Sequence, residues 1–435
     1  MRDENKKEND LMEKIVSLCK RRGFVFQGSE IYGGLAGMYD YGHYGVALRD
    51  NIKELWWKRF VDDREDMYGL DSAILMNQKV WQASGHARGF ADMLVDCTKC
   101  KRRFRVDHLK NKEVCPECGG KLSEARQFYM MLETHLGTVH DEASLSYLRP
   151  ETAQGMFVNF KNVVDSFHPK LPFGIAQIGK AFRNEIAPRD FIFRLRELEQ
   201  MEIEYFVRPT DWEKYFEEFR TQMHEWIKDI GLQKSHVHEI EITDEDRAHY
   251  SKRTIDFEFD FPFGQKELYG LAYRTNYDLT AHKLEYQDEE TKSRIVPHVI
   301  EPSFGLDRTF LAILSDAYTE DELNGEVRSY LKLSPSVAPV KVAVFPLLKN
   351  KPELITKARE VYIILKKLIG AVEFDDNGNI GKRYRRQDEI GTPFCVVIDF
   401  DTLTNDTVTV RDRDTGEQER VKVGELIEFI RNKIN

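Results

Sequence analysis

The chain contains two closely spaced cysteine pairs, Cys97-x-x-Cys100 and Cys115-x-x-Cys118, which must come together in the fold if they bind one metal ion. The pairs are separated by 14 residues, a distance at which two knuckles can close on one ion. Four thiolates suit Zn²⁺ or, less often, an iron–sulfur centre. Because four protein ligands leave no open coordination position, we predict a structural zinc and not a hydrolytic one.

The remaining cysteines, Cys19 and Cys395, stand alone, and we predict that they are buried thiols. Six cysteines in 435 residues are too few for a disulfide scaffold. No run approaches the 18 or so apolar residues of a membrane span, and no apolar secretory signal follows the first residues. We therefore expect a cytoplasmic protein with no membrane partner.

The net charge of −10 argues weakly against a chain coated in nucleic acid. The charge is uneven, however, because residues 341–435 hold 17 basic and 16 acidic residues and the rest of the chain carries −11. This near-neutral segment contains the run Lys382-Arg383-Tyr384-Arg385-Arg386. Such a run is often a solvated face, although an aromatic among basic residues also suits a nucleic-acid contact.

Periodicity predicts an amphipathic helix over residues 9–22 that ends at Gly23, and a long helix over 46–61 after the glycine-rich stretch 33–45. No Gly-Lys-Ser/Thr follows these glycines and no strand precedes them, which excludes a P-loop or a dinucleotide-binding turn. Strands are predicted at residues 175–178, 191–194, 202–207, 254–259 and 268–272. Few crossover helices separate them, so we expect an antiparallel sheet.

A proline- and serine-rich cluster at residues 334–339 indicates a domain boundary. Beyond it the pattern predicts a strand at 341–348, a helix at 352–369, strands at 371–374 and 394–400, a hairpin that turns near 415–416, and a helix at 424–434. This alternation is typical of a small α/β domain. We expect four parts: an N-terminal part of the core at 1–95, a zinc-binding insertion at 96–125, the rest of the core at 126–336, and a C-terminal domain at 337–435.

Three segments resemble motifs 1, 2 and 3 of the class II aminoacyl-tRNA synthetases. They are the glycine-rich stretch 39–45 with its helix, Phe182-Arg183-Asn184-Glu185 followed by Arg194-x-x-x-Leu198-x-x-x-Glu202, and Gly305-Leu306-Asp307-Arg308. The segments 81–86, 148–155, 193–202 and 301–305 resemble glycyl-tRNA synthetase signatures, and 381–392 resembles the anticodon-binding domain of class IIa enzymes. The resemblance covers nearly the whole chain. It implies an α+β homodimer, in which an antiparallel sheet flanked by helices carries a zinc-ribbon insertion and a C-terminal α/β anticodon-binding domain.

Two positions depart from this family's pattern. The proline expected in motif 1 is His43, and the aromatic residue that usually stacks on adenine in motif 2 is Leu198. An aliphatic side chain can still pack on adenine, with Phe193 nearby.

The resemblance implies that the protein activates glycine with ATP to glycyl-adenylate and transfers glycine to the 3′ end of tRNA(Gly). Adenylation depends on positioning and charge stabilisation, so no protein nucleophile is needed. We predict catalytic roles for Arg183 at the α-phosphate, Arg308 at the far phosphates and Glu267 as a ligand of Mg²⁺. Glu185 is expected at the adenine amino group. The predicted ATP-binding set is Arg183, Asn184, Glu185, Phe193, Arg194, Leu195, Arg196, Glu197, Leu198, Glu267, Leu268, Gly305, Leu306, Asp307 and Arg308.

Glycine presents only an ammonium and a carboxylate group. Glu151, Glu202 and Glu301 suit the ammonium with help from Ser303, and Arg105 and Arg274 are candidates for the carboxylate. A filled pocket excludes an added methyl group by sterics. The rest of the predicted glycine-binding set is Leu198, Glu199, Gln200, Met201, Pro302, Phe304 and Gly305.

The basic run supplies the predicted tRNA contacts, Lys382, Arg383, Arg385 and Arg386. Two alternatives stay open at this point. A non-catalytic, synthetase-like nucleic-acid-binding subunit would not need Arg183, Glu185, Glu267 and Arg308 together. An ATP-dependent ligase that transfers glycine to another acceptor would not need the basic C-terminal domain.

Overall fold

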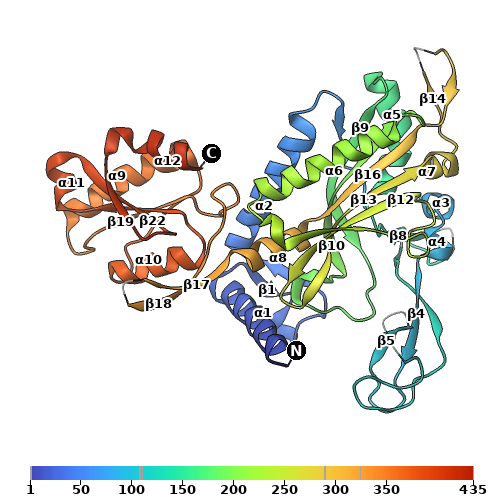
Figure 1. The fold of residues 1–435 in the computed structure, drawn as a ribbon, viewed down its shortest axis with the longest axis horizontal. Coiled ribbons are helices and arrows are strands. Elements are labelled where there is room, and N and C mark those ends of the chain that lie inside the picture. The colour runs from blue at the N-terminus through green and yellow to red at the C-terminus, as the bar shows by residue number, and fades with distance from the viewer. Residues whose placement is uncertain are drawn as a thin grey trace.

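The computed structural model describes residues 2–106, 109, 111–142, 144–288, 291–323 and 325–434. A large N-terminal body and a smaller C-terminal domain lie side by side, and a slender ribbon projects from the body (Figure 1). Within the described ranges, no helix has the length and apolar character needed to cross a bilayer.

A seven-stranded sheet forms the centre of the body. Its strands lie in the order β11 (Val237–Glu241), β12 (Arg253–Phe261), β13 (Gly264–Thr275), β16 (His298–Gly305), β10 (Glu197–Val207), β9 (Phe173–Phe182) and β3 (Met67–Gly69). All neighbours are antiparallel except β3, which runs parallel to β9. The predicted antiparallel sheet is therefore confirmed.

Alternation along β10 gives the sheet two different faces. Odd-numbered residues such as Ile203 and Tyr205 pack in the main core, which also holds residues of α1 (Arg2–Arg22), α2 (His43–Trp57), α6 (Trp212–Asp229) and α8 (Leu306–Ala317). On the opposite face, Phe206 packs with Phe157 and Phe160 of α5 (Ala153–Phe167). Because side chains of a strand alternate in direction, Glu202 and Glu204 lie on the α5 face.

Two sequence predictions differ from the structure in the body. Residues 191–194 were expected to form a strand but contain a 3₁₀ turn, Phe191–Phe193, because Asp190 (φ 61°) and Phe191 (φ 57°) adopt left-handed backbone conformations that no strand accepts. The helix expected over 46–61 begins earlier, at His43, and its last turn, Lys58–Asp62, widens to a π-helix.

Short elements complete the body. They are the pair β1 (Val25–Gln27) and β2 (Tyr39–Tyr41), the helices α3 (Gln78–Ala83), α4 (His86–Gly89) and α7 (Tyr277–Ala281), and the hairpins β7 (Leu132–His135) with β8 (Leu145–Leu148) and β14 (Tyr286–Gln287) with β15 (Arg294–Ile295). The projecting ribbon is a three-stranded sheet in the order β5 (Arg103–Arg105), β4 (Ala91–Asp96) and β6 (Arg126–Tyr129).

The C-terminal domain has its own five-stranded sheet and core, as its sequence pattern predicts. Strand order is β20 (Val372–Phe374), β19 (Val342–Pro346), β21 (Phe394–Ile398), β22 (Thr407–Asp412) and β23 (Gln418–Lys422), with the first three parallel. The helices are α9 (Pro352–Ile369), α10 (Ile380–Glu389), α11 (Phe400–Asn405) and α12 (Leu426–Ile434). The predicted thiols Cys19 and Cys395 are both buried.

A hairpin that the sequence did not predict, β17 (Tyr318–Leu323) with β18 (Glu326–Leu331), joins the two parts. Arg328 of this hairpin bonds Asp321 within the hairpin and Asp388 of α10, and Arg411 of β22 forms a two-point pair with the same Asp388. Arg328, Asp388 and Arg411 are each at most 7% exposed. A buried ionic network therefore fixes the hairpin to the C-terminal domain.

Candidate active site

A cavity of about 490 Å³ opens on the α5 face of the central sheet. All three residues predicted to be catalytic, Arg183, Glu267 and Arg308, line it. So do most other predicted ATP- and glycine-binding residues: Arg105, Glu151, Glu185, Phe193, Arg194, Leu195, Leu198, Glu199, Gln200, Glu202, Leu268, Glu301, Ser303, Gly305 and Asp307. Segments separated by up to about two hundred residues thus meet in one place.

Several predicted site residues are not among those that line the cavity. The guanidinium of Arg196 donates to the backbone carbonyls of Glu185 and Ala36, and Glu197 pairs with Lys180. Met201, Phe304 and Leu306 are fully buried in the core on the opposite face of the sheet. The others are Asn184, Pro302 and Arg274.

One end of the cavity is rich in arginine. Arg308 Nη1 lies 3.0 Å from Glu267 Oε2, and its guanidinium carbon is 4.4 Å from the ring centre of Phe193. The charge of Arg308 lowers the pKa of Glu267, which keeps this carboxylate ionised. Arg183 donates from Nε to the carbonyl of Pro150 at 3.0 Å, which orients its guanidinium.

Asp256 of β12, which no sequence motif indicates, also lines this end. Burial, followed by the nearby charge of Glu267, raises the pKa of Asp256 to about 7. Two carboxyl groups that repel each other beside Arg183, Arg194 and Arg308 provide hard oxygen donors of the kind Mg²⁺ takes next to phosphates. The residues present therefore fit a Mg²⁺ ion.

The other end of the cavity is acidic, with Glu151, Glu202 and Glu301 on its wall. Thr152 Oγ1 and Ser303 Oγ both donate to Glu202, the latter at 3.0 Å. Glu151 accepts from Gln154 at 3.1 Å and lies 3.3 Å from His86 Nε2. His86 belongs to the segment 81–86, and it holds one of the three carboxylates in place.

The protonation states of these carboxyl groups differ. Burial alone would raise the pKa of Glu151, but the charge and hydrogen bond of His86 lower it below its usual range. Burial and then the charge of Glu151 raise the pKa of Glu202. Burial raises the pKa of Glu301 to about 8, although Arg274 opposes this. A cation that entered this end would favour the ionised form of all three.

Two buried residues lie behind the acidic end. Arg274, 2% exposed, donates to Asp278 at 2.8 and 2.9 Å and to Glu301 at 2.7 Å, and its guanidinium lies 3.9 Å from the ring centre of Tyr250. Its donors thus face other side chains. Neither carboxyl oxygen of Glu204 has a hydrogen-bond partner among the described residues, and burial raises its pKa well above the usual range. Burial without a hydrogen-bond partner thus favours the neutral form of Glu204.

Arg105 reaches the cavity from the ribbon. It belongs to β5, lines the cavity, and lies 3.0 Å from Asp92 Oδ2 of the paired strand β4. The position of Arg105 thus depends on the fold of the ribbon.

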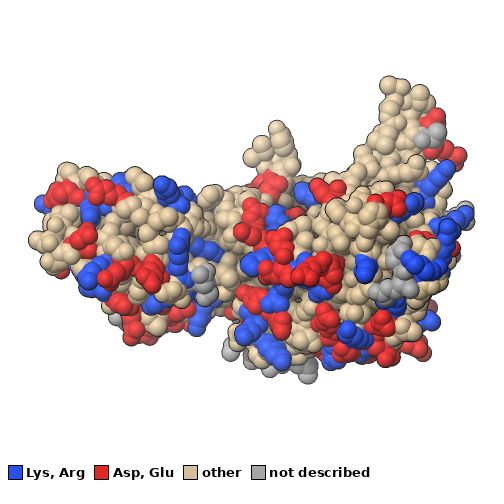
Figure 2. Space-filling view, turned by 90° about the horizontal axis from the view of Figure 1, so that it is seen from above, with Lys and Arg blue, Asp and Glu red and all other residues tan. Residues whose placement is uncertain are grey.

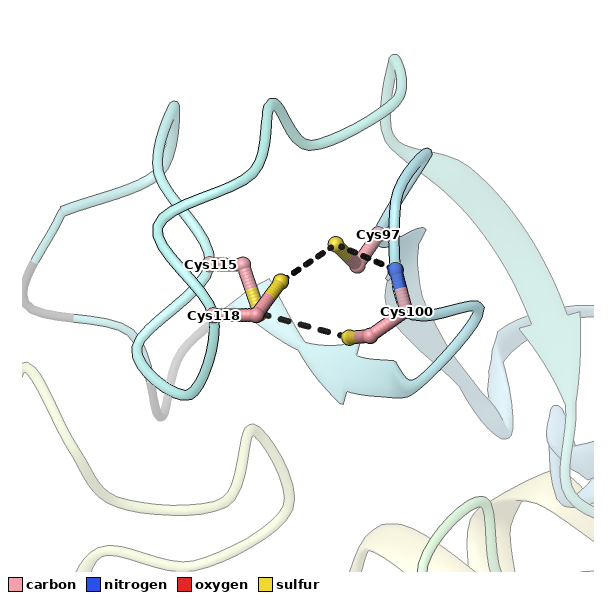
Figure 3. Close-up of side chains that lie close together, drawn as sticks. All are labelled: Cys97, Cys100, Cys115 and Cys118. Carbon is pink, nitrogen blue, oxygen red and sulfur yellow. Dashed lines mark hydrogen bonds between the residues drawn. The ribbon is translucent and has the colours of Figure 1, made fainter.

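The four predicted metal ligands converge at the tip of the ribbon (Figure 3). Their sulfur atoms all lie within 4.8 Å of one another, with 3.5 Å between Cys97 and Cys118 and 3.8 Å between Cys100 and Cys115. Ligands at about 2.3 Å from a tetrahedral zinc are about 3.8 Å apart, so the spacing fits this ion. The backbone amide of Cys100 also donates to Cys97 Sγ at 3.4 Å, as in a zinc knuckle.

A network of charges connects motif 1 to motifs 2 and 3. Arg49 of α2 pairs with Glu199 of β10, and its Nη2 lies 3.6 Å from Asp307 of α8. Tyr41 donates its hydroxyl to Asp307, and the backbone amide of Glu199 donates to the other oxygen of Asp307 at 2.8 Å. Arg49 is not predictable from the sequence, since no local pattern shows that it faces inward.

The basic run lies on α10 of the C-terminal domain. Lys382 and Arg385 are exposed, and Arg385 lies 3.5 Å from Glu326. Arg386 pairs with Asp375. Arg383, predicted as a tRNA contact, is 1% exposed and donates to the carbonyls of Pro346, Asp376 and Gly378. Its side chain therefore closes a loop of the domain and does not reach the surface.

Two family profiles match the chain. The profile described as "tRNA synthetase class II core domain (G, H, P, S and T)" matches residues 138–317, and the profile described as "Anticodon binding domain" matches residues 341–433.

Curated proteins similar to the chain are named glycine–tRNA ligase. The one from Caldanaerobacter subterraneus subsp. tengcongensis is 47% identical over 97% of this chain and 98% of its own length. The one from Thermobifida fusca is 48% identical over 98% and 99%, and the one from Thermus thermophilus is 46% identical over 97% and 99%.

Among solved structures, the fold is similar to that of Giardia lamblia prolyl-tRNA synthetase in complex with prolyl-adenylate. The TM-score is 0.72 at 15% identity, over 99% of this chain and 79% of that one.

Proposed function

Because the chain belongs to the glycine–tRNA ligase family of class II aminoacyl-tRNA synthetases, we propose that its cavity activates glycine with ATP and that glycine then passes to tRNA. One observation carries the assignment of roles. Three arginines and two carboxyl groups gather at one end of the same cavity whose other end holds three glutamates. The arginine-rich end suits a nucleoside triphosphate with its metal ion, and the acidic end suits an ammonium group.

At the acidic end, we propose that Glu151, Glu202 and Glu301 bind the glycine ammonium. Ser303 supports this role because it already orients Glu202 through a 3.0 Å hydrogen bond. Arg105 is the candidate for the glycine carboxylate. Arg274, which forms ion pairs with Asp278 and Glu301, positions Glu301 in this scheme.

At the arginine-rich end, we propose that Arg183 binds the α-phosphate and Arg308 the far phosphates. Arginine suits these sites because its fork of donors matches phosphate oxygens. Glu185, one of whose buried oxygens accepts no hydrogen bond among the described residues and lies 3.9 Å from Arg194 Nη1, is the candidate for the adenine amino group. Leu198 and Phe193 would pack against the adenine ring.

Glu267 and Asp256 would hold the Mg²⁺ that accompanies ATP. The ion, when bound, would neutralise phosphate charge. The protein needs no nucleophile, since the glycine carboxylate attacks the α-phosphorus and pyrophosphate leaves. What the residues supply is orientation and fixed positive charge where negative charge develops.

We propose that the predicted insertion 96–125, which forms the part of the ribbon beyond β4 and β6, is a structural zinc domain that holds Arg105 at the cavity. The C-terminal domain, 337–435, is proposed to bind the anticodon region of tRNA(Gly) through Lys382, Arg385 and Arg386. Arg383 is assigned instead to the structure of the domain, because it is buried.

A homodimer is proposed from exposed apolar side chains next to motif 1. Ile31, Tyr32 and Leu35 are 88%, 87% and 54% exposed, and Val46 of α2 is 47% exposed. Large apolar side chains at such exposure are typical of an interface. Sedimentation at micromolar concentration should give twice the mass of the chain, whereas a single-chain mass would refute the dimer.

The function is tested by glycine-dependent pyrophosphate exchange, followed by transfer of labelled glycine to total tRNA. We expect both activities. Absence of exchange would select the non-catalytic RNA-binding alternative, and exchange without transfer would select a ligase with another acceptor.

A further inference from the structure

A second cavity, of about 550 Å³, lies between the C-terminal domain and the N-terminal body. We call it the interdomain cleft. One wall comes from α9, β20 and α10, and the other from Arg21 and Arg22 at the end of α1 and from His43 and Tyr44 at the start of α2. None of these residues belongs to the active site.

The interdomain cleft is cationic in a chain that is acidic overall. Both signs of charge are interspersed over the face of the molecule shown in Figure 2, with no continuous basic surface. The lining of the cleft, in contrast, holds two carboxylates, Glu373 and Asp375, and five basic side chains: Arg21, Arg22, Arg359, Lys366 and Arg386.

Arg359 and Lys366 are the cations of the cleft that other side chains do not neutralise. Both are exposed, and neither forms an ion pair with a carboxylate in the part of the chain that the structure describes. Lys366 Nζ donates to the carbonyl of Val372 at 3.2 Å. Arg22 and Arg386, by comparison, already pair with Glu389 and Asp375.

Aromatic rings lie next to these two cations. Arg359, Tyr362 and Lys366 form one stripe of α9, at positions i, i+3 and i+7. The guanidinium carbon of Arg359 lies 3.5 Å from the ring centre of Phe374, and the ring of Tyr362 is 5.8 Å from that of Phe374. The stripe thus offers phosphate-binding charge and flat surfaces for a base in one place.

The carboxylates of the cleft are held away from this stripe by other donors. Glu373 accepts from the hydroxyl of Tyr44 at 2.7 Å and from Gln387 at 2.9 Å, and Asp375 pairs with Arg386. Their hydrogen bonds go to α2 and α10, so the charge of α9 stays available.

We propose that the interdomain cleft binds a nucleotide of the tRNA, with its phosphate on Arg359 and Lys366 and its base against Tyr362 or the Arg359–Phe374 pair. Charge combined with aromatic stacking is how proteins hold single nucleic-acid strands without reading their sequence. The inference rests on the proposed function and adds a contact apart from the exposed residues of α10. It places RNA at the junction of the two domains.

The test is the salt dependence of tRNA binding by the full-length protein with Arg359→Gln and Lys366→Gln together. Loss of two phosphate contacts should weaken binding about 10-fold or more at low salt and reduce the slope of log K against log salt by about 1.5. Lys367→Gln is the matched control, because Lys367 neighbours Lys366 on α9 but does not line the cleft. The tRNA affinity of Lys367→Gln and its slope of log K against log salt should equal those of the wild type.

Pyrophosphate exchange without tRNA separates this inference from the proposed function. We expect wild-type exchange in every variant, since the cleft is not part of the active site. Wild-type exchange together with unchanged tRNA binding and slope in the double variant would overturn the cleft inference alone. Equilibrium dialysis with AMP tests whether the cleft binds a free nucleotide instead of tRNA. A second AMP site that disappears in the double variant, with tRNA binding intact, would also overturn it.

Discussion

Substitution of Arg49 by Met should damage the ATP end of the active site although Arg49 does not line the cavity. The change removes the partner of Glu199 and a neighbouring charge of Asp307, whose side chains are 15% and 6% exposed. Breaking a buried ion pair on one side costs about 3–5 kcal/mol. Asp307 keeps its bonds from Tyr41 and from the Glu199 amide, so we expect the lower end, about 3 kcal/mol.

Two measurements follow from this value. The thermal unfolding midpoint should fall by roughly 6 °C, given about 2 °C per kcal/mol for a domain of this size. Steady-state pyrophosphate exchange should show a KM for ATP raised about 10-fold, because Glu199 and Asp307 adjoin Leu198 and Arg308, whereas the KM for glycine should change less than twofold.

Lys53→Met is the matched control, one helical turn further along α2, where Lys53 pairs with the exposed Asp50. It should leave the midpoint and both KM values unchanged. Arg49→Lys keeps the charge but lacks the planar guanidinium with its several donors, and it should recover part of the stability lost in Arg49→Met. Equal KM values for ATP in Arg49→Met and in the wild type would refute the role of Arg49 as a positioning residue.

Three further predictions concern the metal and the acidic end. Chelation of the bound metal, or Cys115→Ser, should lower the unfolding midpoint and raise the KM for glycine through Arg105; unchanged melting with no zinc by elemental analysis would exclude the metal. Glu151→Gln should reduce kcat/KM for glycine by about 100-fold, as expected for loss of a charged contact in a dry site, with the KM for ATP unchanged; exchange at the wild-type rate would remove Glu151 from the site. Burial raises the pKa of Glu301 from 4.5 to about 8, against the opposing charge of Arg274. The KM for glycine should therefore fall from pH 6.5 to pH 9 in the wild type but not in Glu301→Gln. The contribution of Glu301 to the free energy of unfolding should be present below pH 4.5 and lost as the pH rises through 8.

Sequence periodicity predicted many of the helices and strands because the residues that determine these elements lie within the same short segment. The helix at 352–369 matches α9 in both bounds, and the alternation of Glu202 and Glu204 with Ile203 and Tyr205 defines the two faces of β10. The prediction of a strand at 191–194 is wrong because the left-handed backbone conformations of Asp190 and Phe191, and not the side-chain pattern, determine the structure there.

The cavity's lining was predictable where a motif named the residue, and unpredictable where only the folded chain brings groups together. Asp256 of the lining and Arg49, which pairs with the lining residue Glu199, belong to the second kind, since their neighbours in the sequence give no sign of what they face. Arg383 illustrates the converse. Its place in a basic run suggests an exposed cation, yet three backbone carbonyls enclose its guanidinium.

The ionic network around Asp388 has a consequence for how the two parts of the protein would act on one tRNA. Arg328 of the joining hairpin and Arg411 of β22 both pair with Asp388 of α10 while buried from water, and Arg22 of α1 in the N-terminal body pairs with Glu389 of the same helix. A tRNA that reaches both parts is a bivalent ligand, and its second contact becomes intramolecular once the first has formed. Because the spacing between the active site and the C-terminal domain is set in advance, the second contact would form at a high effective concentration. Weak contacts at each end would then suffice for tight binding overall.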